Sequence, residues 1–137
     1  MKTTEVRLLR PVAVFVSALL LTASLPLAAQ SLGLEMLSGL SKGEWTVNYR
    51  DGLGRQKICL KTGMELIQLR HSQSNCNQIV IEETASEVTV QYTCKGAGYG
   101  RTNIRRENGA LVQIESIGIA SGLPFELAAE ARRTGSC

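Results

Sequence analysis

Apolar and polar residues alternate along most of this chain from Trp45 onward, and that period constrains the fold more than any other feature. The stretch from Trp45 to Tyr49 places an aromatic or aliphatic residue at every second position, as on one face of a half-buried strand. The stretch from Glu87 to Cys94 is the clearest amphipathic strand. The predicted strands are residues 45–49, 55–61, 79–83, 87–94, 99–106, 111–120 and 124–133.

Turn-forming residues separate these strands. The pair Asn108-Gly109 is the strongest hairpin signal, because a two-residue turn of this kind needs residues that accept positive φ. Residues 51–54 and the pair Ser121-Gly122 predict further turns. Short strands joined by turns predict an antiparallel meander.

Little of the chain has a helical pattern. Apolar residues recur at near-helical spacing from Leu32 to Leu40, which predicts one short helix. Residues 62–72 lack clean alternation and predict a helical turn or an irregular crossover. We therefore predict a mainly β domain: six or seven antiparallel strands curled into a sheet or a partly open barrel, a short N-terminal helix and two disulfides.

The first 29 residues have the pattern of a secretory signal peptide. Three basic residues lie among the first ten, an uncharged apolar run follows at 12–21, and small residues before Gln30 predict cleavage after Ala29. The uncharged stretch 11–34 is also long enough for an uncleaved membrane anchor. Both alternatives place a single domain at 30–137 in the periplasm, with membrane contact only through the signal segment.

The charge balance bears on possible partners. The chain has 15 Lys and Arg and 12 Asp and Glu; three basic and one acidic residue lie in the first ten positions, which leaves 12 and 11. A domain of net charge +1 lacks the basic surface that nucleic-acid-binding proteins use. The sequence therefore predicts no nucleic-acid partner.

The four cysteines are Cys59, Cys76, Cys94 and Cys137. Their irregular spacing has no Cys-x-x-Cys pair and the chain has one histidine, so we predict no metal site and no cofactor. An exported domain with four cysteines predicts two disulfides in an oxidising compartment. Four cysteines allow three connectivities. We favour Cys59 with Cys76, which closes a short polar loop, and Cys94 with Cys137, which pins the C-terminus.

Three features in this order carry a resemblance to a known family: Gly43-Glu44-Trp45, the four cysteines, and an ending with Arg, Gly and Cys at positions 133, 135 and 137. Behind a signal peptide, they make residues 40–137 resemble the bacterial family called domain of unknown function 3617. The resemblance implies an exported protein, mostly of Gram-negative bacteria, with no established activity. It therefore carries over no catalytic residues.

No group of residues predicts catalysis. The glycine-rich run 96–101 lacks the Gly-Lys-Ser/Thr ending of a phosphate-binding loop and predicts a hairpin or bulge. His71 lies in a polar stretch and is predicted to be a solvated loop residue. Glu82 and Glu83 should be solvated on opposite faces of a strand and protect its edge. We therefore expect that the protein is not an enzyme.

The chain has one concentration of basic residues: Arg101, Arg105, Arg106, Arg132 and Arg133. If the strand at 99–106 lies beside the final strand, Arg101 and Arg105 share a face that Arg132 or Arg133 joins. This arrangement predicts a contact site for an anion or for the envelope surface. The alternative is an ordinary charged outer face on which neighbouring glutamates offset the arginines.

The predicted core anchors are Trp45, Val88, Val90 and Tyr92. A curled sheet with an apolar interior predicts a non-catalytic binding or accessory module of the cell envelope, with a small apolar ligand inside. The inward residues would be Val88, Val90, Tyr92, Val112 and Ile114. The alternatives are a structural or stress-related envelope protein that binds a protein partner through a sheet edge, and an exported enzyme.

Overall fold

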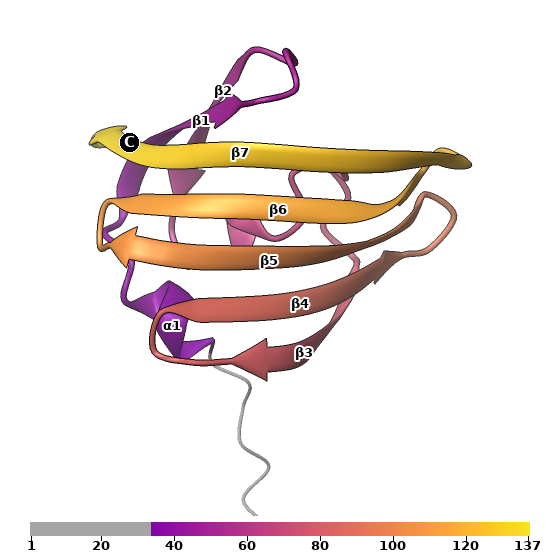
Figure 1. The fold of residues 1–137 in the computed structure, drawn as a ribbon, viewed down its shortest axis with the longest axis horizontal. Helices are drawn as coiled ribbons and strands as arrows, with labels where there is room; N and C mark the ends of the chain where they lie inside the picture. The colour runs from indigo at the N-terminus through magenta and orange to yellow at the C-terminus, as the bar shows by residue number, and fades with distance from the viewer. Residues whose placement is uncertain (1–33) are drawn as a thin grey trace, which may run out of the picture.

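In the computed structural model, residues 34–137 are described, and they form a curved antiparallel sheet with a short helix against its inner face (Figure 1). The elements in chain order are α1 (Glu35–Ser38), β1 (Gly43–Tyr49), β2 (Arg55–Leu60), the 3-10 helix η1 (Met64–Leu66), β3 (Asn77–Glu83), β4 (Glu87–Cys94), β5 (Gly98–Asn108), β6 (Leu111–Ala120) and β7 (Leu123–Gly135). The predicted signal peptide 1–29, its cleavage site and the alternative anchor lie outside the described residues, apart from Leu34 at the end of that stretch.

Every strand pairs with the next strand of the chain, except that β2 does not pair with β3. The sheet order is β2-β1-β7-β6-β5-β4-β3, so β7 returns to pair with β1 while β2 and β3 form the two edges. The seven strands therefore form one open antiparallel sheet. This confirms the predicted mainly β, partly open antiparallel fold. The crossover, defined as residues 61–76, connects the two edges and contains η1.

The hairpin predicted at Asn108-Gly109 is present, but its turn differs from the expected one. Asn108 pairs with Leu111, so the connecting residues are Gly109 and Ala110, and neither has positive φ. The Asn108 side-chain oxygen instead accepts a hydrogen bond from the Ala110 amide at 2.8 Å. A β-bulge just before Asn108 shifts the register by one residue, which explains the displaced turn. The predicted positive-φ turn occurs at the β6–β7 hairpin.

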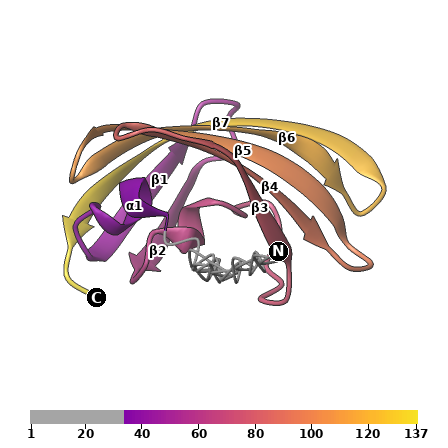
Figure 2. The same ribbon diagram turned by 90° about the horizontal axis from the view of Figure 1, so that it is seen from below.

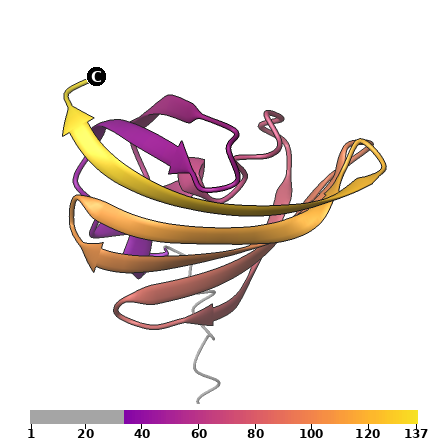
Figure 3. The ribbon, with the colours of Figure 1, turned by 45° about the horizontal axis from the view of Figure 1, so that its top comes forward.

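The sheet is strongly curved, and its concave face holds the core. Figure 2 shows an arch with α1 and the crossover beneath it, and Figure 3 shows that the long strands β5, β6 and β7 bend along their length. The predicted anchors Trp45, Val88, Val90 and Tyr92 all lie on the concave side and are at most 1% exposed. The Trp45 indole nitrogen also donates a hydrogen bond to the Ser41 carbonyl (2.9 Å), which satisfies its polar atom in the core.

The disulfide connectivity differs from the favoured one. Cys59 bonds to Cys137 and Cys76 bonds to Cys94, with Cα separations of 5.7 and 4.2 Å, so both favoured pairs are wrong. Antiparallel pairing of β3 with β4 brings Cys76, just before β3, opposite the end of β4. The favoured pairs were chosen from spacing along the chain, whereas the pairing of strands determines which cysteines lie close together.

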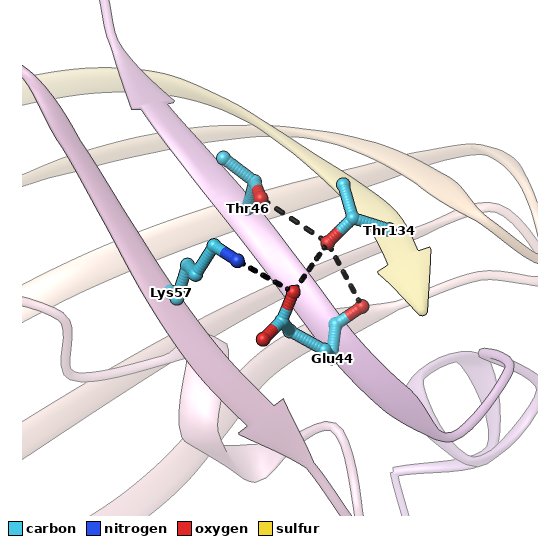
Figure 4. A network of polar contacts seen from close by, with 4 residues as sticks. All are labelled: Glu44, Thr46, Lys57 and Thr134. Atoms are coloured by element: carbon cyan, nitrogen blue, oxygen red, sulfur yellow. Dashed lines mark hydrogen bonds and ion pairs between the residues drawn. The ribbon is translucent and has the colours of Figure 1, made fainter. Parts of the chain in front are cut away.

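The disulfide of Cys137 joins the end of the chain to β2 across β1. On the outer face beside it, Lys57 donates to Glu44 Oε1 at 3.0 Å, and the Thr134 hydroxyl lies 3.2 Å from both that oxygen and the Thr46 hydroxyl (Figure 4). The hydrogen bond from Lys57 lowers the pKa of the Glu44 carboxyl. These contacts link β2, β1 and β7 at the end where β7 stops.

Candidate functional site

A cleft of about 710 Å³ lies between the two edge strands of the sheet, β2 and β3. Its walls come from β2, the crossover and the start of β3. It is lined by Gln56, Ile58, Met64, Leu69, His71 and Gln78, among others. Sites for small molecules typically enclose about 300 to 1,000 Å³ and combine apolar walls with a few polar groups. The cleft between β2 and β3 therefore has the size and the mixed lining of a ligand site.

The crossover begins with a tight local structure. Gly63 has φ 89°, and a Cβ there would lie 2.7 Å from the Leu37 side chain of α1, so glycine is required on both counts. The Glu65 carboxylate accepts hydrogen bonds from the backbone amides of Lys61, Thr62 and Gly63. Partial burial raises the pKa of Glu65, but these bonds outweigh it and lower that pKa below its ordinary value.

We expect Glu65→Gln to lower the free energy of unfolding by about 1 kcal/mol at neutral pH, the usual size of a lost side-chain cap. Because the folded-state pKa lies below the ordinary 4.5, the ionised carboxylate stabilises the fold above that pH. The gain disappears as the pH falls through the folded-state value, so variant and wild type should converge in acid. Urea unfolding across this pH range measures it. Glu35→Gln, at an exposed position of α1, is the control; an equal loss in both variants would contradict the capping role.

His71 closes the inner end of the cleft, and the prediction of a solvated loop residue is wrong: it is 5% exposed. Its Nε2 lies 3.3 Å from the Ala97 carbonyl oxygen and its Nδ1 2.9 Å from the Tyr92 hydroxyl. A carbonyl only accepts, so the neutral ring carries its hydrogen on Nε2 and accepts from Tyr92. The ring also makes edge contacts with Tyr92 and Phe125. The prediction rested on the polar residues that surround His71 in the sequence. The crossover, however, packs against the concave face of the sheet, and this packing buries His71.

Two glycines make room for the aromatic rings around His71. Gly100 is paired with Tyr92 and Gly118 with Phe125 in neighbouring strands. A Cβ on Gly100 would lie 2.4 Å from the Tyr92 hydroxyl, and one on Gly118 would lie 2.9 Å from the Phe125 ring. Aromatic side chains therefore cover cross-strand glycines, a recognised stabilising arrangement. The run 96–101 does form a hairpin, as predicted, but the sequence did not reveal this packing role.

A second pair of polar residues holds the middle of the crossover. Thr102 of β5 donates a 2.6 Å hydrogen bond to the Ile67 carbonyl, and its hydroxyl lies 2.8 Å from that of Ser116 on β6. Burial raises the pKa of Tyr92, and a hydrogen bond with Ser116 opposes the rise. All these groups are buried and paired, so they position the crossover.

Gln78 provides the one unpaired polar atom in this wall. Its Nε2 donates to Gln68 Oε1 at 3.4 Å, whereas its own Oε1 is buried with no hydrogen-bond partner within the described residues. A buried acceptor without a donor costs about 1–3 kcal/mol. A ligand N–H or O–H that reached this oxygen from the cleft would remove this cost. The sequence signal was present but missed: Gln78 is polar at an inward position of a strand.

The charged groups around the cleft differ in their partners. Both carboxylate oxygens of Glu65 are occupied by the contacts described above, whereas Arg70 makes no ion pair with residues 34–137. Burial raises the pKa of Tyr49 and the Arg70 cation opposes this, so the two lie near each other. The Tyr49 hydroxyl donates to Gln56 at 2.6 Å. The cleft thus offers amides, apolar side chains and one cation.

Within residues 34–137, the inward-facing side chains of the sheet are covered. The inward-facing residues Val88, Val90, Tyr92, Val112 and Ile114 are all at most 1% exposed. Side chains of α1 and the crossover belong to the same buried cluster and cover them. The five side chains point inward, as expected, but a ligand has no access to them in this conformation.

The arginines predicted to form a contact site are not side by side. The condition on which that prediction depended is not met, because β6 lies between β5 and β7 and separates Arg101 and Arg105 from Arg132 and Arg133. Arg106 lies on the concave side, where it donates to a carbonyl of the β3–β4 turn. The role of the others in anion or surface contact stays a prediction.

Three of these arginines already have partners. Arg105 lies 3.1 Å from a Glu107 oxygen and Arg132 lies 3.4 Å from a Glu130 oxygen. Arg133 donates through Nε to a backbone carbonyl just before β1. Glu82 and Glu83 are exposed on the edge strand β3, where charge discourages pairing with another chain.

Two disulfides indicate an oxidising environment of the extracellular type. No helix within residues 34–137 is long and apolar enough to cross a membrane. In the same part of the chain, no three His, Cys, Asp or Glu side chains gather as a metal-ligand set. No protein-family model, curated protein or solved structure matches the chain.

Proposed function

We propose that this chain is an exported, periplasmic binding protein that holds a small amphipathic molecule in the cleft between β2 and β3. The proposal takes residues 1–29 as a cleaved signal peptide and places the chain in the family that it resembles. Binding, rather than catalysis, is favoured because the buried titratable and hydroxyl groups behind the cleft, those of His71, Tyr92, Thr102 and Ser116, are paired with one another or with backbone carbonyls.

The observation that carries this proposal is the unpaired Gln78 Oε1 in the wall of a cleft of about 710 Å³. Buried polar atoms normally have a partner, so an unpaired acceptor in a ligand-sized cleft favours a ligand that brings a donor. Ile58, Met64 and Leu69 offer it an apolar surface. The ligand therefore combines an N–H or O–H group with an apolar part.

The test is a native mass spectrum of the protein purified from its own periplasm. We expect the mass of residues 30–137, less two hydrogens for each of the two disulfides, plus a bound small molecule. Gln78→Leu should lose the added mass with little change in stability, because removal of an unsatisfied buried acceptor offsets the loss of the long hydrogen bond to Gln68. Gln91→Leu, on the exposed face of β4, is the matched control and should retain it. Wild-type protein with no added mass, or added mass that survives Gln78→Leu, would contradict the proposal.

A second candidate is a structural envelope protein that acts through a protein partner. The observation in its favour is the exposure of large apolar side chains on the outer face, including Ile79 and Ile117. Pairing through the β3 edge is disfavoured by Glu82, Glu83 and the bulge within that strand. A partner would therefore contact the outer face of the sheet.

A further inference from the structure

The outer face of β5, β6 and β7 exposes apolar side chains that the core does not use. Tyr99 is 49% exposed and Ile117 56%. Tyr99 and Ile119 face each other across β5 and β6, and Pro124 of β7 continues the same row. Neighbouring exposed apolar side chains that include tyrosine are typical of protein contact surfaces.

Charges on the same face follow an antisymmetric pattern about β6. On β5 the outward residues Arg101 and Arg105 are positive, and in the same two rows of β7 the outward residues Glu126 and Glu130 are negative. Farther along, the signs reverse with Glu107 on β5 and Arg132 on β7, although Glu107 is the bulged residue and the row of Arg132 is occupied by Asn108. Arg101 and Arg105 thus each have an opposite charge at the same height on β7, with β6 between them.

We propose that two copies of this chain associate through these outer faces, with a two-fold axis running along β6 in the plane of contact. Such a rotation exchanges β5 and β7, so Arg101 faces Glu126 of the partner subunit and Arg105 faces Glu130 of the partner subunit. Ile117 lies on the axis and packs against its own copy. A self-complementary patch is what a two-fold dimer requires, and sheets packed face to face keep their strands within about 30° of each other.

The central charge pair distinguishes this pattern from an ordinary solvated face. Arg105 and Arg132 have glutamate partners two residues away on their own strands. Arg101 and Glu126 form no ion pair or side-chain hydrogen bond among residues 34–137. The pair nearest the apolar centre is therefore free in the single chain and matched in the dimer.

The curvature of the sheet limits the contact to these three strands. The outer face is convex, so two copies touch along the ridge formed by β5, β6 and β7 (Figure 2). Interfaces of limited area are of the weak, reversible class. The association should therefore depend on protein concentration and weaken with salt, as charge-matched contacts do.

Sedimentation equilibrium of the purified, disulfide-bonded protein tests this directly. Arg101→Glu and Glu126→Arg should each weaken self-association at least about tenfold, since symmetry turns two matched contacts into two repulsive ones. When the two variants are mixed, every contact is matched again, and a heterodimer should form at near wild-type strength. Arg55→Glu, on the outer face of β2, is the control and should associate normally.

Glu115 gives an independent readout. It lies on β6 next to Ile117, so the axis places it against its own copy, and Glu115→Gln should strengthen the dimer by removing a repulsion. Urea unfolding confirms that each variant is folded. A wild-type protein that stays monomeric up to about 1 mM overturns the proposal, as does a mixture of the two charge-reversal variants that remains monomeric.

Discussion

Replacing Cys59 and Cys137 together with serine should lower the free energy of unfolding by about 4.5 kcal/mol. The disulfide spans 78 residues, and closing a loop of that length removes about this much conformational entropy from the unfolded chain. Both cysteines are exposed, so serine adds little packing cost. Urea unfolding of the non-reduced proteins measures the difference. Ser136→Ala, beside the disulfide, should leave stability nearly unchanged.

The same bond gives a direct check on the connectivity. In Cys137→Ser alone, alkylation under non-reducing conditions should label Cys59, because its partner is gone while Cys76 and Cys94 remain bonded. The connectivity favoured by sequence spacing would expose Cys94 instead. Peptide mapping of the labelled thiol decides between them. A label on Cys94, or a stability loss below about 1 kcal/mol in the double variant, would contradict the observed pairing.

Tyr92→Ala should cost about 3–5 kcal/mol, the range for removing a buried aromatic side chain. Tyr92 is 1% exposed, covers Gly100 of the next strand and donates a hydrogen bond to His71. Its loss leaves a cavity over a residue that has no side chain to fill it. Thermal or urea unfolding measures the change. Tyr99→Ala, a half-exposed tyrosine on the outer face of β5, is the matched control and should cost about 0.5 kcal/mol or less.

Tyr92→Phe separates packing from hydrogen bonding at this position. The ring still covers Gly100, but the buried Nδ1 of His71 loses its donor, which should cost about 1–3 kcal/mol. Because His71 attaches the crossover to the concave face of the sheet, we also expect faster amide exchange over residues 68–72. A phenylalanine variant as stable as wild type would show that the hydroxyl contributes nothing. Equal losses for Tyr92→Ala and Tyr99→Ala would contradict the packing argument.

The candidate site exists because the sheet does not close. If β2 paired with β3, the sheet would close into a barrel and these two strands would leave no cleft between them. The crossover lies in the gap, and Thr102 and His71 bind it to the concave face. The site therefore depends on buried polar contacts made by a segment with little regular structure, which explains why its residues are hard to recognise along the chain.

Local patterns in the sequence were sufficient for the strands themselves. A two-residue period directly reflects which side chains face the core, and the residues 87–94 and 111–120 were predicted with the bounds they have in β4 and β6. The short helix and the irregular crossover also followed from local spacing. A hydrogen bond from Ala110 to Asn108 and a bulge moved one turn by a residue, which no local propensity indicated.

The sequence by itself determined the mainly β class, the alternation of buried and exposed faces, and the presence of two disulfides, because each depends on neighbouring residues or on simple counts. The tertiary structure alone decided that β7 pairs with β1, that Cys59 meets Cys137, and that His71 is buried. These contacts join residues far apart in the chain, and no local pattern encodes them. They follow from how the curved sheet, its glycines and the crossover pack together to cover one apolar face.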